Sequence, residues 1–349
     1  MAKKVYVGLS GGVDSSVTAA LLKEQGYDVT GVYMKNWSED IPGFPCPWKE
    51  DYQDAKRVAV QLDIPFKMFD FQTEYRHFVV DYMVQEYQAG RTPNPDVMCN
   101  QEVKFKLFLN SALDDGADMI ATGHYARTKN GRLHTARNAA KDQTYFLYRV
   151  SSEALSKTLF PIGDFKTKAE VRMLARNFGL VTASKKDSQG ICFVGKVGIK
   201  EFLLHELGPQ KPGNIIDESG NVVGKHDGAI FYTIGQRHGL HIGGGLPYYV
   251  SGKNMKTNSL YVTTDLNDKK LWKSVLKLTD IHFIYKQQSF ATENISVRIR
   301  YGAPLVKAKI DKKPRSLLVS LEDAVRAATP GQSVVFYQGP LVLGGGIII

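Results

Sequence analysis

The sequence GLSGGVDS at residues 8–15 constrains the fold of this chain more than any other stretch. It joins an apolar run at residues 5–9 to a helical pattern at residues 17–22 through two adjacent glycines and small hydroxyl residues. Glycines let backbone N–H groups approach an anion, the helix that follows contributes its positive N-terminal end, and serines add hydroxyl donors. An ordinary strand-to-helix corner needs one glycine at most. The pattern therefore predicts a strand, a phosphate-binding loop and a helix, with a nucleotide as ligand.

This loop differs from two common phosphate-binding motifs. It lacks the lysine of G-x-x-x-x-G-K-[ST], and it does not have the G-x-G-x-x-G spacing. Its S-G-G-x-D-S form resembles the pyrophosphate loop of ATP pyrophosphatases, enzymes that cleave ATP to AMP and pyrophosphate while they adenylate an oxygen atom. That resemblance implies ATP as the cofactor and leaves the substrate open.

Apolar runs alternate with helical patterns over residues 5–71, which predicts an α/β domain with a parallel sheet. Such sheets bind ligands at the carboxyl ends of their strands. Gly8 and Met34 lie at two such ends, and a further apolar run at residues 119–127 contains Gly123 and His124 at the same expected edge. A methionine there can pack against adenine or belong to the core. The expected nucleotide-binding residues are Gly8, Leu9, Ser10, Gly11, Gly12, Val13, Asp14, Ser15, Met34 and Gly123.

Two of the three cysteines lie in segments suited to chemistry. Two prolines stiffen residues 92–95, and Asp96 and Cys99 follow three residues apart, just before a predicted helix rich in lysine. A helix N-terminus favours a thiolate, although a capped helix with a buried cysteine fits the same pattern. Cys192 lies on a polar loop at residues 184–193, where Lys185 and Lys186 favour a thiolate. Cys46, which lies among prolines, is interpreted as a bystander.

The charge balance favours a polyanionic partner. The 349 residues include 45 basic and 35 acidic side chains, which gives a net charge of +10. Nucleic acid is the expected partner of such an excess. The first apolar run is too short for a signal peptide, and no stretch approaches the roughly 18 apolar residues of a membrane helix. Three widely spaced cysteines are too few for a disulfide scaffold. We therefore expect a cytoplasmic location and no membrane partner.

The pattern changes along the chain and predicts three domains. A catalytic α/β domain is expected at residues 1–208, a small β-rich domain at 209–270 after a Pro- and Gly-containing linker, and a C-terminal β-barrel at 271–349. Some basic and aromatic residues of the last domain occupy alternating strand positions, so one basic face is expected, which is either an ordinary solvated face or a contact for RNA. These residues are Arg298, Arg300, Tyr301, Lys307 and Lys309.

Five motifs in order resemble the tRNA-specific 2-thiouridylases of the MnmA/TrmU family. They are SGGVDS at residues 10–15, TPNPDVMCN at 92–100, ATGHY at 121–125, KDQTYFL at 141–147 and DSQGICF at 187–193. TIGQR at 233–237 and PGQ at 330–332 extend the resemblance over essentially the whole chain. It implies an adenine nucleotide alpha hydrolase-like catalytic domain and ATP-dependent sulfur transfer to C2 of the wobble uridine in the tRNAs for Lys, Glu and Gln.

The resemblance also implies roles for single residues. Cys192 would carry a persulfide received from an upstream sulfur carrier or cysteine desulfurase. Cys99 would release that sulfur by forming a disulfide with Cys192, or would act as a nucleophile, and Asp96 would serve as general acid or base. Mg²⁺ would neutralise the ATP phosphates, without a dedicated protein metal site. The expected contacts to tRNA or to its flipped-out base are Asn94, Pro95, Asp96, His124, Lys141, Asp142, Gln143, Arg300, Tyr301 and Gln332.

Two other readings use the same loop. Another ATP pyrophosphatase, such as an amide synthetase or a lysidine-type tRNA ligase, would not need two cysteines about ninety residues apart. A nonenzymatic RNA-binding protein that uses ATP as a conformational ligand would release no pyrophosphate. Serine replacement of Cys99 and Cys192 separates the first reading from thiolation, and a pyrophosphate assay separates the second.

Overall fold

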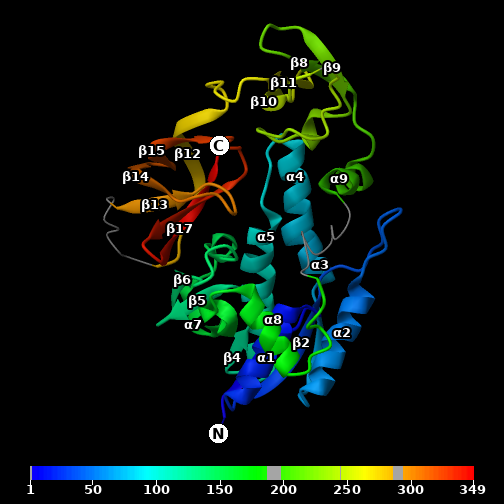
Figure 1. Cartoon of the computed structure of the whole chain (residues 1–349), viewed down its shortest axis with the longest axis vertical. Helices are drawn as coiled ribbons and strands as arrows, with labels where there is room; N and C mark the ends of the chain where they lie inside the picture. Colours follow the sequence, from blue (N-terminus) through cyan, green and yellow to red (C-terminus); the bar gives the residue numbers. More distant parts are fainter. Residues whose placement is uncertain (1, 187–197, 244, 286–293) are drawn as a thin grey trace.

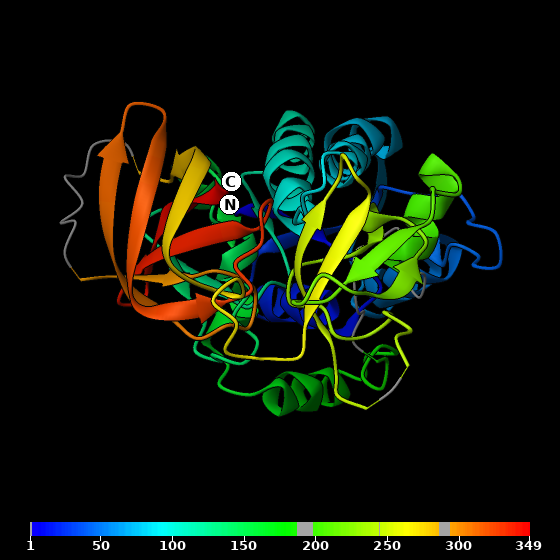
Figure 2. The ribbon, with the colours of Figure 1, turned by 90° about the horizontal axis from the view of Figure 1, so that it is seen from above.

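The computed structural model describes residues 2–186, 198–243, 245–285 and 294–349, and in them the chain forms three sheets. Figure 1 shows a parallel sheet with its helices at the lower end, a small sheet at the upper end and a barrel at the left. Figure 2 shows the barrel and the small sheet on opposite sides of the view. This arrangement confirms the predicted fold class, an α/β domain followed by a small β-rich unit and a β-barrel.

The N-terminal sheet is parallel, with strand order β3-β2-β1-β4-β7. Its strands are β1 (Lys4–Gly8), β2 (Asp28–Lys35), β3 (Phe66–Asp70), β4 (Met119–Ala121) and β7 (Thr158–Leu159). The accompanying helices are α1 (Val13–Glu24), α2 (Trp48–Gln61), α6 (Phe108–Asp114), α7 (Ser152–Ser156) and α8 (Lys168–Asn177), with short turns η3 (Thr144–Phe146) and η4 (Pro161–Asp164). Because β1 is the central strand, its carboxyl end lies in the middle of the ligand-binding edge.

The alternating side chains of β1 face two cores. Val5 and Val7 pack in one cluster with apolar residues of α1, α2 and α8, whereas Tyr6 packs in a second cluster with Phe108 of α6. Successive side chains of a strand point to opposite faces, so both faces of the sheet are covered by helices. The buried sheet therefore holds the end of β1 in a fixed position.

Two long helical stretches contain π-helical turns. The first stretch consists of α3 (Gln72–Tyr75), η1 (Arg76–Asp81) and α4 (Tyr82–Gln88). The next stretch forms α5 (Pro95–Met98), η2 (Cys99–Leu107) and then α6. The prediction that Cys99 precedes its helix was wrong, because the helix begins at Pro95, where a missing N–H costs nothing. Such π-helical turns are often found at functional sites.

The central unit is a four-stranded sheet with order β10-β11-β8-β9. Its strands are β8 (Gly213–Ile216), β9 (Val222–His226), β10 (Tyr249–Asn254) and β11 (Ser259–Thr263), with the turn η5 (Ala229–Phe231) after β9. Phe202 and Leu203 of the preceding helix α9 (Ile199–Leu207) pack in the core of the α/β domain. The small sheet contacts that domain where a Cβ added to Gly90 would lie 2.5 Å from Met255 Cγ.

The C-terminal strands close into a six-stranded barrel. They are β12 (Trp272–Phe283), β13 (Ile295–Arg298), β14 (Val306–Lys313), β15 (Ser316–Arg326), β16 (Ser333–Gln338) and β17 (Leu341–Ile348), and pairing of β12 with β17 closes the ring. A hairpin of the α/β domain, β5 (Ala126–Lys129) and β6 (Arg132–Thr135), joins the same sheet by pairing His134 with Leu341. The hairpin attaches the barrel to the α/β domain.

None of the helices in the described residues is long and apolar enough to cross a membrane.

Candidate active site

The loop between β1 and α1 has the geometry of a phosphate cradle. Gly11 has φ +75°, and a Cβ added to it would lie 2.5 Å from the carbonyl oxygen of Asp51, so glycine is required there. Gly12 is the N-cap of α1 and has no side chain to cover the first N–H groups of the helix. The backbone N–H of Ser10 donates to Ser15 Oγ at 3.2 Å, which ties the two ends of the loop together. Together these features present backbone donors to an anion.

Two glycines let neighbouring strands approach this loop. A Cβ added to Gly8 would lie 2.9 Å from Met34 Cε, so Met34 lies over the end of β1. A Cβ added to Gly123 would lie 2.7 Å from the backbone nitrogen of Ser15. Leu9 and Val13 are 1% and 3% exposed and turn their side chains into the core, so they can serve a nucleotide only through the backbone. The structure thus brings together all the residues that were predicted to bind a nucleotide.

A lysine that sequence reasoning missed lies beside the loop. Lys168 Nζ donates to both carboxylate oxygens of Asp14 at 2.7 Å, and Tyr125 OH donates to Asp14 Oδ1 at 3.1 Å. Lys168 is the first residue of α8, whose N-cap Thr167 accepts a hydrogen bond from the backbone N–H of Glu170. The T-x-x-E sequence at residues 167–170 has the capping-box form that marks the start of a helix, but nothing local in the sequence connects residue 168 with residue 14. The loop therefore obtains from a distant helix the cation that its own motif lacks.

The acid and thiol of the predicted catalytic segment lie on one helical stretch. Asp96 is in the first turn of α5, and Cys99 opens η2 with 3% exposure. Burial raises the pKa of the Asp96 carboxyl, and the nearby Lys104 ammonium partly opposes that rise. A carboxyl with a raised pKa is suited to proton transfer near neutral pH. These contacts support the acid or base role of Asp96, which stays a prediction.

His124 connects the nucleotide loop with this segment. It follows Gly123, and its ring packs on Phe105 and Phe160 with centroid distances of 5.6 and 6.2 Å. Burial, and secondarily the charge of Lys104, lower the pKa of His124 well below its usual value, so the ring is neutral. Lys104 thus acts electrostatically on both His124 and Asp96. Its closeness to both groups was not predicted.

Within the KDQ stretch at residues 141–143, two side chains have internal partners. Asp142 is 3% exposed and accepts hydrogen bonds from Thr144 Oγ1 at 2.9 Å and from Arg298 Nη1 at 3.1 Å. Gln143 Oε1 accepts from the backbone N–H of Tyr125 at 2.9 Å. The charge of Lys141 acts on Tyr301, so these two residues lie near each other. Contacts of Lys141, Asp142 and Gln143 with tRNA stay predictions.

The prediction that Arg298 belongs to an exposed basic face of the barrel was wrong. Ile295 and Val297 of β13 face the barrel core, so Arg298 lies on the opposite side of the strand, where it pairs with the buried Asp142 of the α/β domain. Arg300 is exposed after the strand, and the Tyr301 ring is 43% exposed and lies 4.6 Å from that of Phe146. The junction between the barrel and the α/β domain thus displays Tyr301 with Arg300 beside it.

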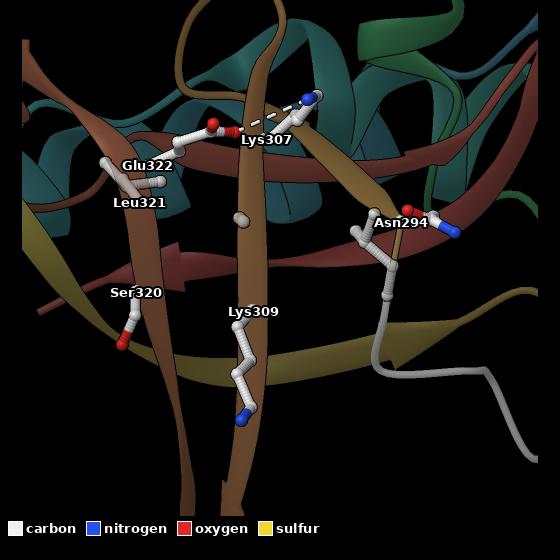
Figure 3. A pocket seen from close by; sticks show the side chains of 8 residues that line it. Asn294, Lys307, Lys309, Ser320, Leu321 and Glu322 are labelled. Atoms are coloured by element: carbon white, nitrogen blue, oxygen red, sulfur yellow. Dashed lines mark ion pairs between the residues drawn. The ribbon is translucent and has the colours of Figure 1, made fainter.

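Farther along the barrel, an open hollow of about 380 Å³ is lined by residues of β13, β14 and β15. Figure 3 shows Lys307 directed toward Glu322, with 3.7 Å between their charged atoms, and Lys309 directed away from it. This mixture of charges gives the hollow no strong preference for an anion. The lysines are exposed, as expected for a solvated face.

The barrel also reaches the proline-rich segment before Asp96. Gln332 Nε2 donates to the carbonyl oxygens of Thr92 and Pro93 at 2.8 and 3.2 Å. Asn94 forms a side-chain hydrogen bond with Tyr145, and Pro95 is buried as the first residue of α5. The segment predicted to hold the target base is therefore held by contacts from the barrel and from the α/β domain.

Cys192 and the rest of the motif at residues 187–193 lie outside the described residues. The residues just before the motif, up to residue 186, are described. Lys185 Nζ donates to Asp51 Oδ1 at 2.8 Å and to Asp54 Oδ2 at 2.6 Å, both on α2. The carbonyl of Asp51 is the group that approaches Gly11, so residue 185 is anchored next to the phosphate loop. The charge of Lys185 is committed to these carboxylates, which weakens the expectation that it activates a thiol.

The comparisons with known proteins cover almost the whole chain. Family models match residues 3–196 as a tRNA methyl transferase HUP domain, 200–264 as a tRNA methyl transferase PRC-barrel domain and 273–348 as an aminomethyltransferase beta-barrel domain. A solved 4-thiouridine synthetase in complex with RNA and ATP covers 58% of this chain and 49% of its own, at 21% identity and a TM-score of 0.38. That likeness is too distant to bear on function.

Curated relatives are much closer. The tRNA-specific 2-thiouridylase MnmA of Enterococcus faecalis is 47% identical over 356 residues, covering 99% of this chain and 95% of its own. The enzymes of the same name from Staphylococcus aureus and Geobacillus thermodenitrificans are each 48% identical, again over 99% of this chain and over 95% and 94% of their own lengths. The domain models are named for methyl or aminomethyl transfer, whereas these relatives are named for uridine thiolation. Because the relatives match nearly the whole chain at 47–48% identity, they determine the family. The chain therefore belongs to the family of tRNA-specific 2-thiouridylases.

Proposed function

We propose that this protein uses ATP to replace the C2 oxygen of the wobble uridine in the tRNAs for Lys, Glu and Gln with sulfur. The observation that carries the proposal is the Gly123-His124 pair. Gly123 contacts the phosphate loop at Ser15, and the centroid of the His124 ring lies 5.6 Å from that of Phe105 on η2, the helical stretch that begins at Cys99. The nucleotide loop and the stretch that carries Cys99 are thus each in contact with one of two adjacent residues.

The loop supplies the first step. Backbone N–H groups around Gly11 and Gly12 hold the ATP phosphates while the uracil C2 oxygen attacks the α-phosphorus and pyrophosphate leaves. The residues here fit a nucleotide, because the loop has the donors and a glycine at each close approach. Mg²⁺ bound to the phosphates would offset their charge when present. Asp14, whose carboxylate is bonded to Lys168, is the acidic residue of the loop at residues 8–15 and would be the loop residue to hold such an ion.

Sulfur transfer is the second step. A persulfide on Cys192, loaded by an upstream carrier or desulfurase, provides the sulfur that bonds to C2 as AMP departs with the former oxygen. In one route Cys99 attacks the sulfur attached to Cys192, which forms a disulfide and frees the outer sulfur as sulfide, and an external thiol later reduces the disulfide. In the other route the Cys99 thiolate attacks C2 of the base and displaces AMP, and the outer sulfur of the Cys192 persulfide then displaces Cys99 from C2. The freed Cys99 thiolate attacks the Cys192 sulfur, which leaves the outer sulfur on C2 and forms the disulfide. Asp96 accepts or returns the proton in either route.

The remaining parts of the chain serve tRNA. The proposal assigns catalysis to residues 1–208 and tRNA contact chiefly to residues 271–349, with residues 209–270 between them. Asn94, Pro95 and Asp96 would hold the flipped base, and His124, Lys141, Asp142, Gln143, Arg300 and Tyr301 would contact the tRNA. The net charge of +10 supports a polyanionic substrate, and the reaction is proposed for the cytoplasm, where thiols stay reduced.

Incorporation of labelled sulfur into tRNA tests the proposal. The assay contains ATP, Mg²⁺ and a persulfide donor, and it compares the parent with Cys192→Ser, Cys99→Ser and the control Cys46→Ser. We expect sulfur at the wobble uridine with the parent and the control, and none with the other two variants. Pyrophosphate release without sulfur transfer by the parent would contradict thiolation and favour another ATP pyrophosphatase activity.

A further inference from the structure

A turn of the barrel is bonded to the backbone of the proline-rich segment. The N–H of Thr92 donates to the carbonyl oxygen of Pro330 at 2.9 Å, and Gln332 Nε2 donates back to the carbonyls of Thr92 and Pro93 at 2.8 and 3.2 Å. These bonds link groups about 240 residues apart in the sequence. Both backbone polar groups of Thr92 therefore have their partners in the turn at residues 330–332.

The middle residue of this turn has no room for a side chain. Gly331 has φ +93°, and a Cβ added to it would lie 2.9 Å from each of the backbone N, C and O atoms of Thr92. These neighbours are backbone atoms, which cannot swing aside as the end of a flexible side chain can. The turn thus lies directly against the segment, and glycine permits the close approach.

Two further contacts hold the same segment. Tyr145 OH donates to the carbonyl of Ser333 at 2.9 Å and also bonds with the Asn94 side chain, so it joins the barrel to the start of residues 94–96. Thr92 Oγ1 lies 3.1 Å from Thr233 Oγ1 of the central unit. All three parts of the chain therefore meet at Thr92, which is 8% exposed.

We propose that the barrel turn at residues 330–332 is a positioning element for the base-binding segment 94–96, with Gln332 and Gly331 as its positioning residues. The inference rests on the proposed function, since it assumes that residues 94–96 hold the target base. Pro93 and Pro95 make the segment stiff, so a displacement at Thr92 is passed on to Asp96 rather than absorbed. A misplacement of about 1 Å at a reacting group can lower a rate by roughly a hundredfold.

This role differs from a direct contact between Gln332 and tRNA. The Gln332 amide nitrogen serves two protein carbonyls, so its removal loosens the base-binding segment and leaves the exposed tRNA-facing surface unchanged. A tRNA contact would instead contribute to tRNA affinity. A positioning role therefore predicts a lower kcat for sulfur transfer with an unchanged Kd for tRNA. A tRNA contact predicts a weaker Kd for tRNA.

The test compares Gln332→Ala and Gly331→Ala with the control Gln338→Ala, an exposed glutamine at the end of β16. Measurements are kcat for sulfur transfer, the Kd for tRNA by filter binding, the Kd for ATP and the unfolding temperature. We expect kcat to fall about tenfold or more in the first two variants. Both Kd values should stay within about twofold of the parent, and the control should match the parent.

Each other result would overturn the inference. Parental kcat in both variants would remove the positioning role. A Kd for tRNA that weakens as much as kcat falls would make the turn a tRNA contact, and a rate loss that follows a lower unfolding temperature in both variants would make it purely structural. Failure of the parent itself to transfer sulfur is a distinct result, which would remove the proposed function and the inference with it.

Discussion

The contact between Gly123 and the phosphate loop gives a quantitative prediction for Gly123→Ala. The added Cβ would lie 2.7 Å from Ser15 N, 2.8 Å from Asp14 C and 3.0 Å from Ser15 Cα. Ordinary contact begins at 3.4 Å, so the loop and the strand must separate by about 0.7 Å. All three atoms belong to the loop backbone, whose N–H groups are the proposed phosphate donors.

A shift of that size should weaken ATP binding substantially. Donors displaced by more than about 0.5 Å lose much of their hydrogen-bond energy, and we expect the Kd for ATP to rise by about ten- to a hundredfold, or about 1.4–2.7 kcal/mol. Isothermal titration calorimetry measures this change directly. Gly243→Ala is the matched control, because a Cβ at Gly243 meets nothing within 4 Å. A Kd for ATP within about twofold of the parent in Gly123→Ala would refute the reasoning.

Two further variants test ion pairs that the structure adds to the site. Lys168→Met leaves the Asp14 carboxylate uncompensated beside the loop. The Kd for ATP should therefore rise about tenfold, while the Kd for AMP stays within about twofold. The control is Lys166→Met, at an exposed lysine. An equal loss for AMP in calorimetry would contradict this charge argument. Arg298→Met strands the buried Asp142 carboxylate, and we expect the free energy of unfolding in urea to fall by about 3 kcal/mol, with partial recovery in the double variant with Asp142→Asn. A parental urea midpoint for Arg298→Met would show that the pair is not stabilising.

Local patterns in the sequence predicted the fold and the nucleotide loop well. The adjacent glycines of residues 11 and 12, the capping box at Thr167 and the alternation of strands and helices all act through neighbours in the chain, so they can be interpreted from spacing alone. The turn at Asn130 and Gly131 adopts positive φ values of 52° and 70°, as a tight hairpin requires. In each of these cases the physical cause lies within a few residues.

The contacts that complete the site are not local, and the sequence carried no signal for them. Lys168 looks like an ordinary first-turn residue of a helix, and its partner Asp14 lies 154 residues away. Arg298 occupies an alternating strand position that reads as exposed until the hairpin and residue 142 pack against the barrel. The π-helical turn at Cys99 likewise depends on tertiary packing, since intrinsic propensity favours a regular helix.

Strand β17 takes part in three pairings that close the barrel and attach it to the α/β domain. β17 (Leu341–Ile348) pairs with β16, with β12 to close the barrel, and with β6 to fasten the hairpin. During synthesis the α/β domain can form early, whereas barrel closure waits until β17 has been made. A variant without β17 would keep the nucleotide loop but lack the closed barrel. Support of the proposed base-binding segment by the barrel therefore comes later than folding of the nucleotide loop.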